Sequence, residues 1–255
     1  MIDKPFIENK LSADKEAVII TEHLKKTLGG NDILKDINLS VYRSETLIIL
    51  GKSGSGKSVA LKCIVGLMKP TSGTVNVLGK IVSDITIREL QELRKKIGFI
   101  FQSGALYDSM SVRENLEFPL VRNENLSPDE VEKRIKEVLA DVGLEESIGK
   151  MPSELSGGMR KRIGLARTLI MKPEIMLYDE PTTGLDPATS REISNLILKM
   201  QDKFKVSSVI VTHDIECAKL TANRIVVLKE GFIAAEGSFE DLQNSDDDFV
   251  KGFFK

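Results

Sequence analysis

The sequence predicts an α/β domain with a mostly parallel central sheet, and three observations lead to that fold class. An apolar run at 47–50 precedes the glycine-rich segment GKSGSGKS at 51–58, and apolar residues at helical spacing follow it, which indicates a strand, a loop and a helix. Strands and helices alternate again between 175 and 235, as in a parallel sheet with helices on both faces. The stretch in between, about 103–172, has helical patterning without a strand and predicts a helical insertion.

The residues before the glycine-rich segment predict an antiparallel sheet. Apolar and polar residues alternate near 18–20 and 33–41, and Gly29-Gly30-Asn31-Asp32 provides a turn between them. Residues 1–16 are polar with scattered charge, which indicates a mobile lead-in. Beyond 58 we expect the loop's helix, a short strand pair near 75–79, an amphipathic helix at 87–96 and a strand at 97–101 that ends in Gln102.

Capping signals place most of the remaining helices. Ser127-Pro128 opens a helix at 128–141 that Gly143 ends, and Ser156 precedes a helix that runs to about Met171. We expect 17–240 to form one domain and 241–255 to form a short C-terminal helical extension. The other expected elements are a short helix at 111–118, strands at 175–179, 206–212, 224–229 and 232–235, and helices at 187–203 and 214–222.

Composition limits the class of protein. With 255 residues, 41% of them hydrophobic, the chain can bury a large core. A formal net charge of −2 argues against a dedicated nucleic-acid binder. No apolar run approaches the roughly 20 residues that span a bilayer, and the N-terminus has no secretory pattern, so we expect a cytoplasmic protein that meets a membrane through a partner. Cys63 and Cys217 lie among apolar residues, which is typical of reduced, buried thiols.

The segment 51–58 fits the phosphate-binding pattern of a glycine, four free positions and Gly-Lys-Ser. Its glycines permit positive backbone dihedrals, so that successive N–H groups and the following helix N-terminus converge on phosphate oxygens. Lys57 adds a positive charge and Ser58 a hydroxyl suited to Mg²⁺, which predicts a nucleoside triphosphate site. A glycine-rich turn without a ligand is the alternative. The expected binding residues are Gly51, Lys52, Ser53, Gly54, Ser55, Gly56, Lys57, Ser58 and Val59.

Polar side chains end three of the predicted strands, where open parallel sheets bind ligands. Asp179 is expected to hold Mg²⁺, and Glu180 to polarise the water that attacks the γ-phosphate. Gln102 and His213 are candidates to contact metal-bound water or the γ-phosphate, although a histidine at a strand end is more often structural.

A second set of backbone N–H groups, Ser156-Gly157-Gly158, precedes a helix and predicts a second anion site. One nucleotide rarely needs two such sites in one chain. A symmetric dimer resolves this if each set faces the other subunit's 51–58, which places two ATP molecules at the interface. An ordinary helix cap is the alternative for this segment.

Together and in this order, these motifs resemble those of ABC-transporter ATPases over about residues 17–240. The resemblance implies a P-loop NTPase of ABC ATPase type, with a RecA-like, mostly parallel sheet core, an N-terminal antiparallel β subdomain and an inserted helical subdomain. It also implies Mg²⁺-dependent ATP hydrolysis by a homodimer. The implied roles are a Walker A loop at 51–58 with catalytic Lys57, a Q-loop at Gln102 that contacts metal and water, a signature at 155–159 with Ser156, Gly157 and Gly158, Walker B at Asp179, catalytic Glu180, a D-loop around Asp186 and a switch histidine at His213.

Two positions depart from the family's pattern. Leu28 lies where many members stack an aromatic ring on adenine, so an apolar contact is expected instead. Met159 lies where most signatures carry Gln, which removes a hydrogen-bonding group but leaves the donors at 156–158.

A narrower resemblance concerns 101–107, 115–120 and 151–159, which are similar to the ATPase of Mla systems, the MCE-associated phospholipid transporters. It implies two ATPases under integral membrane permease subunits at the cytoplasmic face of the inner membrane, with an MCE-type protein continuing the lipid path. An importer of amino acids or another small solute is the first alternative. A soluble ABC protein acting on ribosomes or DNA is the second; such proteins usually carry two ATPase units or a long coiled coil, so no nucleic acid is expected here.

Overall fold

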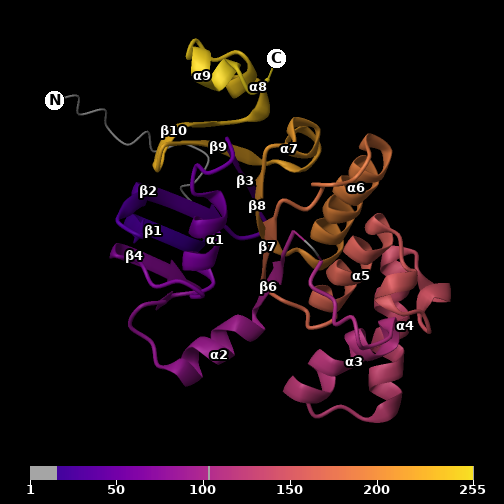
Figure 1. The fold of residues 1–255 in the computed structure, drawn as a ribbon. Helices are drawn as coiled ribbons and strands as arrows, with labels where there is room; N and C mark the ends of the chain where they lie inside the picture. The colour runs from indigo at the N-terminus through magenta and orange to yellow at the C-terminus, as the bar shows by residue number, and fades with distance from the viewer. Residues whose placement is uncertain (1–15, 103, 255) are drawn as a thin grey trace.

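The computed structural model describes residues 16–102 and 104–254 (Figure 1). The predicted mobile lead-in at 1–16 therefore lies outside the described residues, apart from Glu16. The described strands form one sheet in the order β5-β4-β1-β2-β10-β9-β3-β8-β7-β6. Among these residues, no helix is both long and apolar enough to cross a membrane.

The predicted parallel core is present at one end of this sheet. β3 (Thr46–Gly51) pairs in parallel with β8 (Ser207–Thr212) and β9 (Arg224–Lys229), and β7 (Ile175–Asp179) pairs with β8 and with β6 (Ile97–Ile100). The carboxyl ends of these strands consequently meet at the same edge, where open sheets bind ligands.

The predicted antiparallel strands form the other end. β1 (Ala17–Leu28) and β2 (Asn31–Tyr42) make a hairpin, and β4 (Ser72–Val77) with β5 (Lys80–Ile81) extends it. β10 (Phe232–Gly237) joins the two ends, because it pairs antiparallel with β9 and in parallel with β2. The antiparallel part is thus continuous with the parallel core, a connection that local sequence patterns do not reveal.

Helices cover both faces of the core (Figure 1). Side chains alternate along β3, so Leu47 and Ile49 pack in one buried cluster with α1 (Lys57–Ile64), while Ile48 and Leu50 pack in the other. The second cluster also holds α6 (Pro187–Phe204) and α7 (Ile215–Thr221). The predicted fold class, α/β with a mostly parallel core, is confirmed.

The stretch between β6 and β7 is helical, as predicted. It contains α3 (Val112–Asn123), α4 (Pro128–Val142) and α5 (Gly157–Leu169), with short 3₁₀ turns at Glu145–Ser147 and Pro152–Glu154, whereas α2 (Ile87–Lys95) precedes β6. The expected end of a helix at 118 is wrong, because α3 continues through Pro119. Leu116 and Leu120 are fully buried, and their burial offsets the backbone hydrogen bond that proline cannot donate.

The C-terminal segment docks on the same chain. α8 (Phe239–Gln243) and α9 (Asp248–Lys251) follow the N-caps Ser238 and Asp247, and Val250 of α9 is fully buried. The Phe249 ring lies 4.4 Å from the ammonium of Lys229 and 5.7 Å from that of Lys52 in the glycine-rich loop. The C-terminal helices therefore contact the neighbourhood of 51–58.

Both cysteines are buried and free, as expected. Burial raises the pKa of each thiol, Cys63 and Cys217, to about 11. A buried thiol with such a pKa carries little thiolate at neutral pH, which is typical of structural cysteines.

Candidate nucleotide-binding site

The phosphate loop (51–58) runs from the end of β3 into the start of α1, and its backbone requires glycine. Gly56 caps α1 with φ of 102°, and a Cβ there would lie 2.7 Å from Leu34 Cδ2. A Cβ at Gly51 would lie 2.5 Å from the hydroxyl of Ser55. A side chain at Gly51 would collide with Ser55 in the loop, and one at Gly56 would collide with Leu34 of β2. Glycine at these two positions therefore allows the loop to curl around a ligand.

Lys57 places its ammonium group at the centre of this loop. Nζ donates to the backbone oxygens of Gly51 at 2.7 Å and Lys52 at 3.2 Å, and it lies 3.5 Å from Oε1 of Glu180. The Ser55 hydroxyl is buried nearby and has no hydrogen-bond partner among the described residues. A buried hydroxyl without a partner and a buried ammonium fit the oxygens of a phosphate group.

Ser58 and Asp179 form the expected metal-binding pair. The Ser58 hydroxyl donates to Oδ1 of Asp179 at 2.7 Å, across the gap between α1 and the end of β7. A hydroxyl and a carboxylate are ligands of the type that Mg²⁺ prefers, so the residues present fit that ion. Gln102, the third expected contact, lies exposed just beyond β6, and no hydrogen bond within 16–102 or 104–254 joins it to this pair.

Glu180 lies between a lysine and a histidine. Its Oε1 faces Lys57, while Oε2 lies 2.8 Å from Nδ1 of His213 and accepts a hydrogen bond from the Thr183 hydroxyl at 3.2 Å. The backbone of Glu180 has φ of 53°, in the left-handed region, which costs about 1–3 kcal/mol for such a residue. The chain holds this conformation partly through the hydrogen bond from Glu180 N to the carbonyl of Val211 on β8.

Lys161 is a site residue that the sequence analysis missed, because Arg160-Lys161-Arg162 has the pattern of a solvated helix start. Its ammonium group donates to the carbonyl oxygens of Pro181 at 2.6 Å and Thr183 at 3.0 Å, and approaches that of Glu180 at 3.4 Å. Burial lowers the pKa of Lys161. The lysine therefore ties α5 to the turn that follows Glu180, and only the folded arrangement reveals it.

The signature loop (156–158) forms the start of α5. Ser156 is the helix N-cap and accepts a hydrogen bond from Met159 N at 3.2 Å. A Cβ at Gly158 would lie 2.6 Å from the Thr189 methyl group, so the loop packs against the start of α6. No hydrogen bond among the described residues joins the signature loop to the phosphate loop of the same chain.

The two remaining predicted contacts are Leu28 and Val59. Leu28 ends β1 and is 37% exposed, which leaves its side chain free to contact a flat ligand. Val59 follows Ser58 in α1 and is half-buried against the core.

A glycine-rich loop at the carboxyl edge of a parallel sheet, with a serine–aspartate pair that joins α1 to β7 and a glutamate just after β7, defines a P-loop nucleoside triphosphatase. Within that class, residues 34–183 match the family described as ABC transporter. Because the match covers more than half of the sequence, the chain belongs to the ABC transporter family.

Relatives within the family carry different transport names. The chain is 38% identical over 230 residues to the probable ribonucleotide transport ATP-binding protein mkl of Mycobacterium bovis, which covers 90% of this chain and 64% of the relative. It is 37% identical over 216 residues to the methionine import ATP-binding protein MetN 2 of Bacillus cereus, covering 84% of this chain and 63% of that protein. This chain thus spans less than two thirds of the length of either relative.

Solved structures share the fold. One is the dimeric, post-hydrolysis state of the ATP-binding cassette MJ0796 bound to ADP and Pi, with a TM-score of 0.79, 35% identity and coverage of 87% of this chain and 98% of that one. Another is cbiO1 from Clostridium perfringens, part of the ABC transporter complex cbiONQ, with a TM-score of 0.82, 33% identity and coverage of 89% and 90%. The ABC ATPase fold is therefore established for this chain.

Proposed function

We propose that this chain binds Mg·ATP in the phosphate loop and hydrolyses it as the ATPase subunit of a membrane transporter. The observation that carries this proposal is the position of the Glu180 carboxylate, 3.5 Å from Lys57 and 2.8 Å from His213, beside the Ser58–Asp179 pair. In this proposal Lys57 is the phosphate-binding cation, Ser58 and Asp179 are the metal-binding pair, and Glu180 is the base.

The residues divide the chemistry among them. Lys57 exchanges its carbonyl acceptors in the loop for phosphate oxygens, and the loop's backbone N–H groups hold the same phosphates. Ser58 and Asp179 would hold Mg²⁺, which supplies neutralisation of phosphate charge. Glu180 accepts a hydrogen bond from the attacking water, and His213 fixes the orientation of the carboxylate from its other side. Gln102 is the candidate to contact the γ-phosphate or metal-bound water.

The proposed working unit is a homodimer with two ATP molecules at its interface. The signature loop supplies a second set of N–H donors that its own chain does not use on the phosphate loop, and a two-fold dimer brings it to the partner's nucleotide. The dimeric solved relative is consistent with this arrangement.

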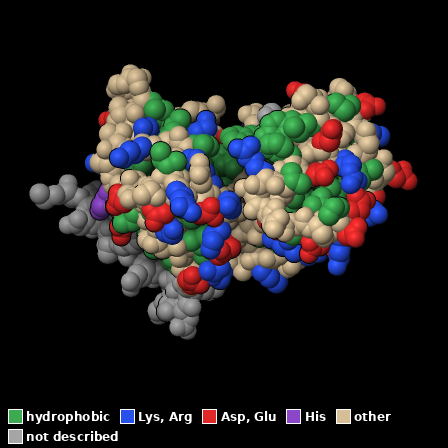
Figure 2. All heavy atoms as spheres, turned by 90° about the horizontal axis from the view of Figure 1, so that it is seen from below, with side chains coloured by type: hydrophobic (Ala, Val, Ile, Leu, Met, Phe, Trp, Pro, Cys, Tyr) green, Lys and Arg blue, Asp and Glu red, His purple; other side chains and the backbone are tan. Residues whose placement is uncertain are grey.

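The proposed partner is an integral membrane permease, and the structure offers a place for it. A cleft of about 580 Å³ lies between α2 and β6 on one side and α3 and α5 on the other. Figure 2 views the molecule from this side and shows hydrophobic side chains gathered in a hollow, with Lys and Arg side chains around it. We call this cleft the docking groove.

The proposed cargo is phospholipid, moved with an MCE-type protein at the cytoplasmic face of the inner membrane. The resemblance of 101–107, 115–120 and 151–159 to Mla ATPases supports this cargo. The names of the relatives, ribonucleotide transport and methionine import, support a small-solute importer as the second candidate. Identification of the permease, followed by lipid transfer between reconstituted vesicles, separates the two.

The ATPase assignment is tested by Glu180→Gln. The amide keeps the shape of the side chain but cannot accept a proton, so hydrolysis is expected to fall by about 10²–10⁴-fold while Mg·ATP binding survives. Phosphate release and fluorescent-nucleotide binding measure the two quantities. Glu192→Gln, on the exposed face of α6, is the matched control, and wild-type turnover in Glu180→Gln would remove Glu180 from its role.

A further inference from the structure

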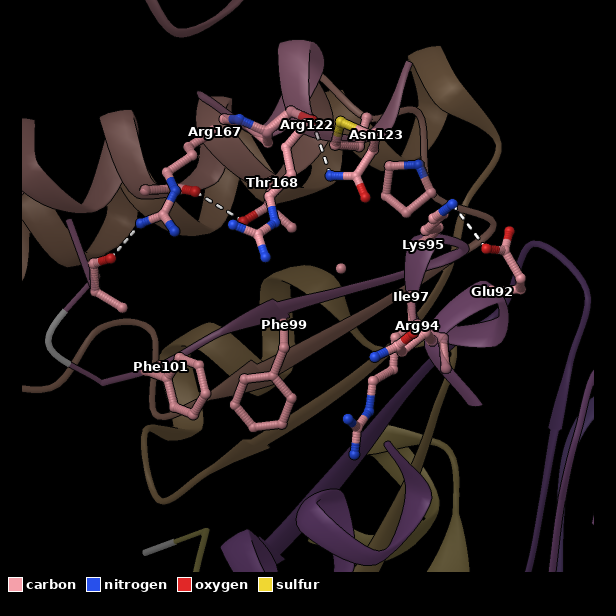
Figure 3. Close-up of a pocket in the computed structure, with 18 residues that line it drawn as sticks. Glu92, Arg94, Lys95, Ile97, Phe99, Phe101, Arg122, Asn123, Arg167 and Thr168 are labelled. Atoms are coloured by element: carbon pink, nitrogen blue, oxygen red, sulfur yellow. Dashed lines mark hydrogen bonds and ion pairs between the residues drawn. The ribbon is translucent and has the colours of Figure 1, made fainter. Parts of the chain in front are cut away.

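Helix α5 begins at the signature loop and carries Lys161 about one turn further on. The far half of the same helix lines the docking groove, where Arg167 and Thr168 lie (Figure 3). Packing there is close, since a Cβ at Gly164 would lie 2.7 Å from the carbonyl oxygen of Gly104. A helix packed this closely moves as one body, so a displacement of the signature loop also displaces Lys161.

The segment that begins with Glu180 lies along the start of α5. A Cβ at Gly157 in the signature loop would lie 3.4 Å from a methyl group of Leu185, so the loop touches this segment. Lys161 binds the beginning of the segment, through the carbonyl oxygens of residues 180, 181 and 183. The signature loop and the proposed base are therefore attached to neighbouring turns of one helix.

The ammonium group of Lys161 also determines where the Glu180 carboxylate lies. The carbonyl oxygen of Thr183 accepts a hydrogen bond from this group at 3.0 Å, while the Thr183 hydroxyl donates to Oε2 of Glu180 at 3.2 Å. The bond to the carbonyl oxygen of Pro181, at 2.6 Å, holds the same turn from its other end. Hydrogen bonds of a half-buried ammonium are stronger than those in water, so the turn and its carboxylate follow α5.

In the proposed dimer, the two attachments of α5 concern different nucleotides. The signature loop of one subunit contacts the ATP held by the partner's phosphate loop, whereas Glu180 acts on the ATP of its own subunit. Helix α5 consequently joins the ATP of the partner subunit to the base of its own subunit.

We propose that Lys161 is a positioning residue that couples the two ATP sites of the dimer. ATP held by one subunit fixes the signature loop and α5 of the other, and Lys161 of that other subunit then places its Glu180 for hydrolysis. The inference rests on the proposed function, because it requires two nucleotides at a dimer interface. Each subunit then hydrolyses its own ATP efficiently only while its partner also holds ATP.

The experiment mixes two forms of the full chain before Mg·ATP is added. The hydrolysing subunit keeps Glu180, and the holding subunit carries Glu180→Gln. The holding subunit is in large excess, so nearly every hydrolysing subunit pairs with one by mass action. The rate of the first phosphate release, at saturating holding subunit, then reports a single site.

Lys161→Met is placed in one subunit at a time. In the hydrolysing subunit it is expected to lower the rate about 10- to 100-fold, because Glu180 of the same chain loses its support. The same change in the holding subunit is the matched control and should leave the rate within about twofold, because that subunit contributes only its signature loop to the site. The affinity of the hydrolysing subunit alone for Mg·ATP should stay within about threefold, which distinguishes positioning from binding.

Ser156→Glu in the hydrolysing subunit tests the coupling itself. The signature loop of that subunit faces the ATP of the holding subunit, yet the rate at the intact site is expected to fall about tenfold or more. Combined with Lys161→Met in the same chain, Ser156→Glu should lower the rate no further than the larger single effect, because both changes break one link. Lys161→Gln, which keeps an N–H donor, should lose less than Lys161→Met and repeats the test with a different side chain.

Three outcomes overturn the inference: equal losses for Lys161→Met in the two subunits, an unchanged rate with either variant in the hydrolysing subunit, or losses that multiply in the double variant. Thermal melts show that each variant is folded, and light scattering shows that it pairs with the holding subunit. Absence of Mg·ATP hydrolysis by the wild-type chain, or of a nucleotide-dependent dimer, would instead reject the proposed function. Failure of the coupling alone leaves both of these properties in place.

Discussion

At the scale of single residues, the site depends on how the turn after Glu180 is held. The left-handed backbone of Glu180 is strained, and its side chain is shared between Lys57 and His213. Lys161 restrains the turn from one side, and on the other the Thr182 hydroxyl donates to Asp214, the N-cap of α7. Residues outside the phosphate-binding motifs therefore determine where the proposed base lies.

Lys161→Met is expected to lower the rate of ATP hydrolysis by about 10- to 100-fold, because the carbonyl oxygens of Pro181 and Thr183 lose their donor and Glu180 shifts. Methionine preserves most of the packing of the stem, so the affinity for Mg·ATP should change little. Steady-state kinetics with a parallel binding titration measure both. Arg160→Met, on the exposed side of the same helix, is the control, and equal rates for both variants would contradict the role of Lys161.

At the scale of elements, the sequence predicted most strands and helices, to within one or two residues at many ends. Apolar runs such as 175–179 and caps such as Ser127 are local signals, and the structure follows them. Three features were not predictable in this way: the continuation of α3 past Pro119, the position of β10 between β9 and β2, and the contact of α9 with the phosphate loop. Each depends on partners distant in sequence.

The same distinction applies to the candidate site. Glycine spacing and the ends of strands predicted four site residues: Ser58, Asp179, Glu180 and His213. In the structure Ser58 is hydrogen-bonded to Asp179. Glu180 lies within ion-pair distance of His213 and Lys57. Lys161 was not predicted, because its partners are backbone carbonyl oxygens, and patterns of side chains do not indicate such contacts. Gln102 lies just beyond β6, which ends at Ile100, and its contact with the Ser58–Asp179 pair stays a prediction.

The contact between α9 and the phosphate loop makes a stability prediction. Phe249→Ala removes a ring that packs against Phe253, at 5.3 Å, and against the ammonium groups of Lys229 and Lys52. The free energy of unfolding is expected to fall by about 2 kcal/mol, because apolar burial is lost. The affinity for ATP is expected to weaken a few-fold, because the ammonium group of Lys52 loses its contact with the Phe249 ring. Urea denaturation and nucleotide titration check both effects. Phe232→Ala, on exposed β10, serves as the control; equal losses in the two variants would contradict a specific role for Phe249.

At the scale of the whole molecule, one chain holds two anion-binding loops that do not meet. The phosphate loop ends β3 in the sheet core, whereas the signature loop begins α5 in the helical insertion and packs on α6. In the proposed dimer each nucleotide lies between the phosphate loop of one subunit and the signature loop of the other. ATP then links the two subunits, and dimer formation becomes dependent on nucleotide.

Ser156→Glu tests whether the signature loop acts on the nucleotide of the partner subunit. A glutamate at the N-terminus of α5 is compatible with the helix dipole, so the fold should persist, but its carboxylate repels the phosphate brought by the partner subunit. We expect affinity of the monomer for Mg·ATP to stay within about threefold, while hydrolysis falls by about 100-fold or more and ATP no longer drives dimer formation in the Glu180→Gln background. Light scattering, nucleotide titration and phosphate release measure these three quantities.

Ser127→Glu makes the same change at the N-cap of α4 and should alter none of them. Unchanged hydrolysis in Ser156→Glu would mean that the phosphate loop works without the second subunit, and loss of monomer affinity would mean that the signature loop serves its own chain.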